Sequence, residues 1–248
     1  MKFFKRLARI VRDTADVIER PYLLLLRHKG VPKSLAVSLD RSWLRDLRFR
    51  TIVDVGANTG QFAIAAHNIF PQARIYSFEP LHDVYKELVR RTASLSGIQT
   101  FNLALGEEAG TITFWRNEFT PSSSVLMMAE AHRQAFPYTS TSQAVEVRIE
   151  RLDTIAETLT MESELLLKID VQGYEDRVLR GATRTVERAA MLLIEISFET
   201  LYEGQASHDE IARFARTHGF EYAGALDQLL CPRTGRILSA DGIFLRKP

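Results

Sequence analysis

Short apolar runs alternate, from residue 51 onward, with stretches whose apolar residues recur at helical spacing. This rhythm is typical of an α/β protein with an open, mostly parallel sheet. It predicts strands near residues 51–55, 73–78, 98–103, 164–170, 190–196, 219–223 and 242–246, and helices near 60–69, 82–95, 151–160, 175–187 and 207–218. Because the runs ELLLKIDV and AMLLIEIS are almost wholly apolar, we expect them to form central strands that are covered on both faces.

Two segments, at residues 111–117 and 144–150, depart from this rhythm. Their apolar and polar residues alternate, which indicates strands with one exposed face. The connection between them, residues 118–143, is rich in Ser, Thr and Pro and is long for a link between two strands. Because long surface loops often carry function, we predict a substrate lid over residues 118–143.

The first 49 residues form a basic arm. Their apolar positions recur at helical spacing with Lys and Arg on the other faces, which predicts an amphipathic helix that Pro21 interrupts. Residues 1–50 hold four Lys and nine Arg against four Asp and one Glu, an excess of eight positive charges in a chain whose net charge is +1. We therefore predict a basic, helical N-terminal extension over residues 1–49 and one domain over residues 50–248.

Two interpretations of the arm stay open. A basic amphipathic helix can lie on an anionic membrane surface. It can also pack as a cap on the domain or in a homodimer interface, which we favour. The apolar run at residues 22–26 is five residues long, far below the roughly 20 residues that a membrane span needs. A nucleic-acid partner is disfavoured, because the basic residues lack an interleaved aromatic platform.

Composition narrows the class of protein further. A chain of 248 residues that is 46% hydrophobic and 25% charged is typical of a soluble globular protein. Its one cysteine, Cys231, excludes an internal disulfide and metal clusters of the CxxC type. A reducing compartment is therefore expected, and we predict a cytoplasmic protein, with membrane association through the arm as the alternative.

The stretch VDVGANTG, at the end of the first predicted strand, carries the clearest indication of a ligand. In an open α/β sheet the ligand lies beyond the carboxyl ends of the strands. Gly56 and Gly60 allow the backbone to approach it, and Asn58 tolerates left-handed geometry. A dinucleotide site would need the spacing GxGxxG, which brings pyrophosphate to a helix terminus. The different spacing here, with Asp54 at the strand end, disfavours a polyanion and suits a cationic ligand group.

A second acidic residue, Glu79, follows the next predicted strand in RIYSFEP. It lies about 20 residues beyond the loop, where a carboxylate can accept hydrogen bonds from both hydroxyls of a ribose. Dinucleotide sites and S-adenosylmethionine sites share this feature. Together with the preceding loop, Glu79 favours S-adenosylmethionine as the cofactor.

The order of these strand-end motifs resembles the FkbM family of S-adenosylmethionine-dependent methyltransferases. The motifs are VDVGANTGQF, YSFEP, FNLALGEEAGTITF, ERLDTI, LLLKIDVQGYEDRVLRGA, LLIEISF and DGIFL. They span roughly residues 50–246, so the arm lies outside the resemblance. The resemblance implies a class I methyltransferase fold, which is Rossmann-like: a seven-stranded, mostly parallel sheet whose last strand is antiparallel and lies between the fifth and the sixth.

The resemblance also implies cofactor contacts at the ends of the first three strands. Those to the methionine part are Asp54, Gly56, Ala57, Asn58 and Gly60. Those to the ribose are Glu79 and Pro80, and those to the adenine are Asn102 and Ala104, with the backbone of Leu103 as an alternative.

Two more acidic residues, Asp170 and Glu195, end the fourth and fifth predicted strands, so both should lie at the mouth of the site. The pair is similar to the acidic pair with which catechol-type O-methyltransferases hold Mg²⁺. Asp170 and Glu195 are therefore candidates for a catalytic base or for magnesium ligands. The structural alternative is that Asp170 caps the following turn and that Glu195 pairs with Lys168 or an arginine. Lys168 could itself neutralise Asp170, touch the substrate or form a structural ion pair.

These features predict an S-adenosylmethionine-dependent O-methyltransferase. KIDVQGYE lacks the prolines with which methyltransferases acting on nucleic-acid bases grip a flipped base, so a hydroxyl acceptor is favoured. The resemblance suggests a sugar of a glycolipid or glycan, including a lipid-linked sugar, or a polyketide-type natural product. Two alternatives remain. A nicotinamide-dependent oxidoreductase would need a different glycine pattern, and a non-catalytic binding module would not need Asp170 and Glu195.

Overall fold

The computed structural model describes residues 15–16, 18–139 and 141–247, and its centre is a seven-stranded sheet. The sheet has the order β3-β2-β1-β7-β8-β10-β9. Its strands are β1 (Thr51–Val55), β2 (Arg74–Phe78), β3 (Ile98–Phe101), β7 (Leu165–Ile169), β8 (Ala189–Ser197), β9 (Phe220–Leu230) and β10 (Ile237–Arg246). β10 is antiparallel to β8 and β9, whereas the other neighbouring strands are parallel. The predicted fold, with its last strand between the fifth and the sixth, is confirmed.

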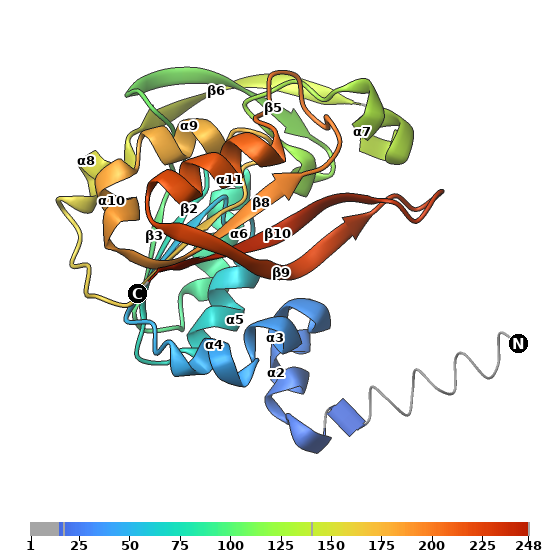
Figure 1. The fold of residues 1–248 in the computed structure, drawn as a ribbon. Helices are drawn as coiled ribbons and strands as arrows, with labels where there is room; N and C mark the ends of the chain where they lie inside the picture. The colour runs from blue at the N-terminus through green and yellow to red at the C-terminus, as the bar shows by residue number, and fades with distance from the viewer. Residues whose placement is uncertain (1–14, 17, 140, 248) are drawn as a thin grey trace, which may run out of the picture.

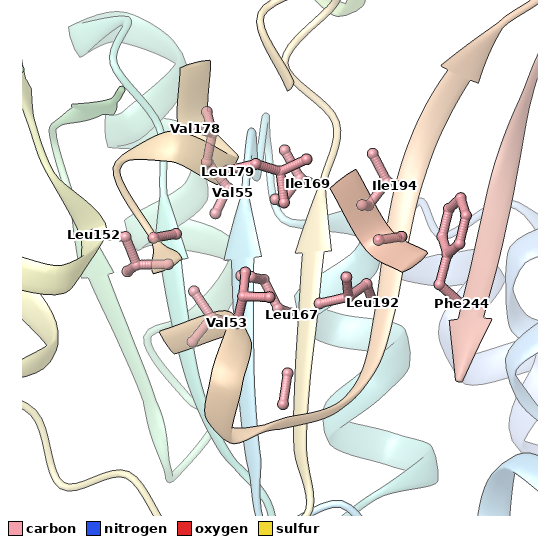
Figure 2. Close-up of a cluster of buried hydrophobic side chains, with 14 of the residues drawn as sticks. Val53, Val55, Leu152, Leu167, Ile169, Val178, Leu179, Leu192, Ile194 and Phe244 are labelled. Atoms are coloured by element: carbon pink, nitrogen blue, oxygen red, sulfur yellow. The ribbon is translucent and has the colours of Figure 1, made fainter. Parts of the chain in front are cut away.

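Helices cover both faces of this sheet (Figure 1). The helices of one face are α8 (Leu152–Ala156), α9 (Glu175–Arg180), α10 (Thr183–Arg188) and α11 (His208–Thr217). The other face carries α5 (Gln61–Ile69) and the helices of the arm, and α6 (His82–Thr92) links β2 to β3. Figure 2 shows the first interface, in which Val53, Leu167 and Leu192 of the strands face Leu152 and Leu179. Burial on both faces explains why the central strands are so uniformly apolar.

The helix predicted over residues 175–187 is broken in the structure. α9 ends at Arg180 and α10 begins at Thr183. A Cβ on Gly181 would lie 1.8 Å from the carbonyl oxygen of Gly106, so a neighbouring loop occupies the space of a side chain. Hydrophobic spacing carries no sign of such a tertiary contact. The helix predicted over residues 151–160 is also shorter, since α8 ends at Ala156.

The last two strands are longer than predicted. β9 and β10 form an antiparallel hairpin that extends well into the stretch between the two predicted strands, residues 219–223 and 242–246. The register of the hairpin shifts between Ile237 and Ser239, between Ala240 and Gly242, and between Ile243 and Phe244. Such bulges interrupt the period of two by which a strand is recognised in a sequence.

A second, smaller sheet has the order β4-β6-β5. Its strands are β4 (Ala104–Leu105), β5 (Gly110–Asn117) and β6 (Ser142–Glu150). β5 and β6 are the two strands that the alternating patterns predicted, and they pair antiparallel. Phe114 and Ile149 of this sheet pack with Leu81 and Val84, which follow β2.

The connection between β5 and β6 is anchored to the main domain. It contains α7 (Glu130–Ala135) and two short 3-10 helices, at Thr120–Ser122 and Pro137–Thr139. Ser124 Oγ donates a 2.6 Å hydrogen bond to the carbonyl oxygen of Gln172, and the buried ring of His132 packs against Tyr202. The segment is packed against the main domain in the structure, and its role as a lid stays a prediction.

The described part of the arm shares a hydrophobic core with the domain. It forms α2 (Tyr22–His28), α3 (Lys33–Leu39) and α4 (Ser42–Asp46), which lie on the α5 side of the sheet (Figure 1). Leu26 and Leu39 are buried in the same cluster as Phe62 and Ile64 of α5. Most of the predicted amphipathic helix lies outside the described residues. Among the helices that the structure does describe, none is long and apolar enough to cross a membrane.

Packing of the arm makes a direct prediction about stability. Leu26 is 2% exposed whereas Leu25, its neighbour on α2, is 51% exposed. Leu26→Ala should lower the free energy of unfolding by about 2–5 kcal/mol because it leaves a cavity in the shared core. Leu25→Ala, the matched control, should change it by less than about 0.5 kcal/mol. Urea denaturation followed by circular dichroism measures both, and an arm that folds independently would leave the main transition of Leu26→Ala unchanged.

Candidate functional site

A cavity of about 340 Å³ lies at the carboxyl ends of the parallel strands. Many residues that the sequence analysis proposed for the site line it together. They are Gly56, Ala57, Asn58, Glu79, Pro80, Ala104, Asp170 and Glu195. Asp54, Gly60 and Asn102 are not part of this lining and lie behind it. Strands far apart in sequence thus converge on one edge of the sheet, as parallel α/β sheets require.

The loop after β1 has the backbone geometry that its glycines and Asn58 predicted. Gly56, Asn58 and Gly60 have φ angles of 77°, 47° and 87°, all in the left-handed region. A Cβ on Gly56 would lie 1.8 Å from the carbonyl oxygen of Asp170. The glycine is therefore required twice, for its φ angle and for the close approach of the end of β7.

Glu79 is held in place by the backbone around it. Its carboxylate accepts hydrogen bonds from the backbone N–H groups of Asn58, at 3.0 Å, and Leu81, at 2.9 Å. Burial raises the pKa of Glu79 to about 7, although these two donors oppose the shift. Asn102 stabilises the backbone that carries Glu79, because its Nδ2 donates to the carbonyl oxygens of Glu79 and Pro80, at 2.9 and 2.8 Å. Asn102 therefore shapes the turn that carries Glu79 rather than facing the cavity.

Asp54 differs from its expected role as a direct ligand contact. Its side chain is fully buried and lies 3.0 Å from the Nζ of Lys168, as a buried ion pair. Ser77 Oγ contacts its second oxygen at 3.4 Å. Lys168 Nζ also donates to the carbonyl oxygen of Gly56, at 2.9 Å, and lies 3.6 Å from Asp170. Asp54 thus supports the loop through Lys168. Two of the roles considered for Lys168 fit this geometry: it forms a structural ion pair with Asp54, and it neutralises Asp170.

Asp170 and Glu195 are joined by an amide that the sequence analysis did not single out. Gln172 Nε2 donates to Asp170 Oδ1 at 2.8 Å and to Glu195 Oε2 at 2.7 Å. The other end of the amide, Gln172 Oε1, accepts from the hydroxyl of Tyr202 at 2.8 Å. Ser239 Oγ donates to the second oxygen of Glu195 at 2.9 Å. The two carboxylates therefore face the same donor.

The alternative structural roles for these carboxylates do not match the contacts. The turn after Asp170 is capped by Glu175, which accepts from the N–H groups of Val171 and Gly173 at 3.0 and 3.1 Å. Glu195 pairs with Gln172 and Ser239 rather than with a lysine or an arginine. Burial, and then the charge of Asp170, raises the pKa of Glu195 well above its usual range.

Gln172, Tyr202, Ser239 and Asp241 were missed by the sequence analysis. Gln172 has a φ of 58°, uncommon for a residue other than glycine, but no side-chain pattern reveals that strain. Asp241 lines the cavity and lies opposite Glu195 in the pairing of β10 with β8. The sequence shows Asp241 at the start of DGIFL, but only the register of the hairpin places it at the site.

Magnesium does not fit the donor set. Within the described residues, no group of three or more His, Cys, Asp or Glu side chains is arranged to hold a metal ion. The space between Asp170 and Glu195, where a shared ion would lie, is spanned by the Gln172 amide, which donates to both. The magnesium prediction is therefore not supported by the residues of this site.

Comparisons with known proteins agree with this architecture. The family model described as "Methyltransferase FkbM domain" matches residues 54–222. The chain is 27% identical over 202 residues to the 2-O-methyltransferase NoeI of Sinorhizobium fredii, covering 79% of each chain. It is 28% identical over 217 residues to the 31-O-demethyl-FK506 methyltransferase FkbM of Streptomyces tacrolimicus, covering 77% of this chain and 81% of that one. It is 33% identical over 153 residues to the methyltransferase sdnD of Sordaria araneosa, and spans 59% of its length.

The fold is also similar to that of a solved structure. The crystal structure of a methyltransferase FkbM from Methylobacillus flagellatus KT aligns with a TM-score of 0.51 at 14% identity. The alignment covers 93% of this chain and 60% of that chain. At this identity the likeness concerns the fold alone. The family match, in contrast, is one continuous stretch of more than half the chain that includes Asp54, Glu79, Asp170 and Glu195, so the protein belongs to the FkbM family of S-adenosylmethionine-dependent methyltransferases.

Proposed function

We propose that the protein transfers a methyl group from S-adenosylmethionine to a hydroxyl group of a sugar or of a polyketide-type molecule. The observation that carries this proposal is the pair of carboxylates, Asp170 and Glu195, held by one amide at the wall of the cavity. A hydroxyl must lose its proton when it is methylated, and a carboxylate pair can take it. An amine acceptor that is already uncharged would not need such a pair.

The names of the relatives support an oxygen acceptor. Two of them are a 2-O-methyltransferase and a 31-O-demethyl-FK506 methyltransferase, and a third, from Haloferax volcanii, is a hexuronic acid methyltransferase with 24% identity over 144 residues. The two acceptors that these names print, FK506 and a hexuronic acid, belong to different chemical classes. Relatedness alone therefore supports O-methylation and leaves the acceptor of this chain to be inferred from its own cavity.

The cofactor is assigned to the part of the cavity formed by β1 and β2 and by the segment after β3. In this assignment Gly56, Ala57 and Asn58 face the methionine part, Glu79 accepts from the ribose hydroxyls, and Ala104 lies along the adenine. S-adenosylmethionine supplies an electrophilic methyl group on a positively charged sulfur. The loop geometry supports this over a dinucleotide, because it lacks the GxGxxG spacing of a pyrophosphate site.

Asp170 and Glu195 then act on the acceptor. The acceptor oxygen forms a bond to the methyl carbon, the carbon–sulfur bond breaks, and the hydroxyl proton passes to the carboxylate pair. Because the Gln172 amide donates to both carboxylates, they are held side by side and share the role of base. Gln172 holds the two carboxylates in fixed positions relative to each other. Positioning of the reactants supplies a further part of the rate enhancement.

Cofactor identity is tested by binding. The purified protein should bind S-adenosylmethionine in isothermal titration calorimetry and should show no heat of binding with NAD at the same concentrations. A preference for NAD would reject the proposed function and favour the oxidoreductase alternative. Binding of S-adenosylmethionine without turnover of any hydroxylated acceptor would favour a non-catalytic binding module.

Substitution tests the shared role of the carboxylates. Asp170→Asn and Glu195→Gln should each lower kcat by about 10²–10⁴-fold, measured as release of S-adenosylhomocysteine with an acceptor that the wild type methylates. The kcat of the double variant should be only slightly lower than that of the less active single variant, because the effects of residues that act as a unit are strongly non-additive. Cofactor affinity and melting temperature serve as controls and should stay close to wild type. Losses that multiply in the double variant would contradict a shared base.

Cofactor affinity should depend on pH through Glu79. Burial raises its pKa to about 7, so the carboxylate gains a proton as the pH falls through 7 and then loses acceptor capacity for the ribose hydroxyls. Affinity should therefore rise with pH, by up to about tenfold per unit below the pKa. Asp54 and Lys168 also act electrostatically on Glu79, but both are fixed in their ion pair.

Two variants separate Glu79 from other titrating groups. Glu79→Gln should bind S-adenosylmethionine more weakly and lose most of the pH dependence between pH 6 and pH 8, the range around a pKa of about 7. His82→Gln removes an imidazole that contacts Asn102 and should keep the wild-type slope. A pH slope that disappears in His82→Gln and persists in Glu79→Gln would refute the assignment.

A further inference from the structure

The cavity has a second half, on the far side of Asp170 from the cofactor loop. Its walls are Glu195 of β8, Asp241 of β10, and Leu226 and Asp227 of β9. In the strand order β3-β2-β1-β7-β8-β10-β9, this half lies beyond β7, opposite the strands assigned to the cofactor. An acceptor must lie against Asp170 and Glu195 to give up its proton, so we assign this half, named here the acceptor half, to the acceptor.

The arm closes the acceptor half. Pro32, Ser34 and Leu35, at the start of α3, line the same cavity as Asp227 and Asp241. α3 packs directly on β9 and α5, so this wall is part of the folded domain. Both the arm residues and the hairpin residues lie outside residues 54–222, the stretch that the family shares.

The charges of the acceptor half are strongly unbalanced. Asp170, Glu195, Asp227 and Asp241 line it, whereas Lys168 is the one Lys or Arg among the described residues of the cavity wall. The ammonium of Lys168 is already engaged, at 3.0 Å from Asp54 and 2.9 Å from the carbonyl oxygen of Gly56. The sulfonium of a bound donor would offset one negative charge, and above pH 7, where Asp241 with its pKa of about 7 is ionised, carboxylate charge would remain in excess.

Asp241 is the carboxylate with unused capacity. It lies directly opposite Glu195 across β10 and β8, and its partly exposed side chain forms no hydrogen bond or ion pair with any described residue. Burial, and then Asp170, raises its pKa to about 7. A partly desolvated carboxylate that lines a cavity gains from a donor, and the hydroxyl or ammonium groups of a ligand can supply one.

We propose that the acceptor half binds a neutral or amine-bearing polyhydroxyl ring, with Asp241 and Asp227 accepting its hydrogen bonds, and that it excludes rings carrying a carboxylate or a phosphate. Exclusion follows because an anionic group would be desolvated beside like charges without a free cation to pair with. The inference rests on the proposed function, since it names the acceptor class of the same site. It also gives the arm a part in acceptor recognition.

Three probes that differ in charge test this selectivity. The methyl glycosides of glucose, glucosamine and glucuronic acid are added in turn to the full chain with S-adenosylhomocysteine, and saturation-transfer NMR measures their binding. The glucoside and the glucosaminide should bind, and the glucuronide should bind at least about tenfold more weakly. Equal or tighter binding of the glucuronide, or binding of none of the three, would overturn the proposal.

Variants locate the selectivity. At pH 8, above the pKa of about 7 of Asp241, Asp241→Asn should tighten glucuronide binding by about tenfold relative to the glucoside, because one like charge is removed. Asp227→Asn, at an exposed position, should act in the same direction and covers the case in which Asp241→Asn folds poorly. Asp209→Asn, where the side chain is 86% exposed on α11 and outside the cavity lining, is the charge-matched control and should change nothing. Selectivity that is unaltered in both Asp241→Asn and Asp227→Asn rejects their role.

The part of the arm is tested by adding a cation to it. Ser34→Lys should increase affinity for the glucuronide, whereas Ser42→Lys, an exposed arm position outside the cavity lining, should not. An equal response of the two variants would remove the arm from the site. Calorimetry with S-adenosylmethionine separates the two levels of failure. A chain that does not bind it fails the proposed function, and a chain that binds it but prefers the glucuronide fails this inference alone.

Discussion

A buried cation, Lys168, fixes the arrangement on which the rest of the site depends. Its ammonium lies between Asp54 of β1 and Asp170 at the end of β7, and it donates to the carbonyl oxygen of Gly56. Burial alone would lower the pKa of Lys168, but Asp54 and Asp170 together raise it above its ordinary value, so the charge is kept. Because losing one partner of a buried pair costs about 3–5 kcal/mol, the ends of the two strands cannot separate cheaply.

This constraint is transmitted to both reacting partners. The cofactor loop begins at Gly56, whose missing Cβ lets it contact the carbonyl oxygen of Asp170, and the carboxylate of Asp170 is shared between Lys168 and Gln172. From Gln172 the contacts continue to Glu195 and Tyr202. The loop proposed to hold the methyl donor and the carboxylates proposed as the base are thus held by one connected set of side chains. Such preorganisation is how a transfer reaction with little covalent chemistry of its own is accelerated.

Features that depend on residues close together in the sequence could be predicted, and features that depend on contacts between distant residues could not. The apolar strands, the left-handed loop with Gly56 and Asn58, and Glu79 at the next strand end are local patterns, and each lies where it was expected. The close approach of Gly106 to Gly181, where the predicted helix is broken, joins residues 75 positions apart, and the position of Asp241 depends on the register of a bulged hairpin. Neither has a local signature. Asp54 was correctly associated with the loop, but only the structure shows that it acts through Lys168.

The two halves of the cavity differ in how much of their lining lies within the stretch that the family shares. The loops after β1 and β2, with Asp170 and Glu195, fall within the stretch that the family shares, so methyl transfer itself can be read from similarity. Ser34 and Leu35 on one side and Asp227 and Asp241 on the other fall outside it. Two relatives with the same core can therefore surround the acceptor with different charges. For this reason the acceptor of this chain follows from the carboxylates and the arm that surround its own cavity, and not from the acceptors for which its relatives are named.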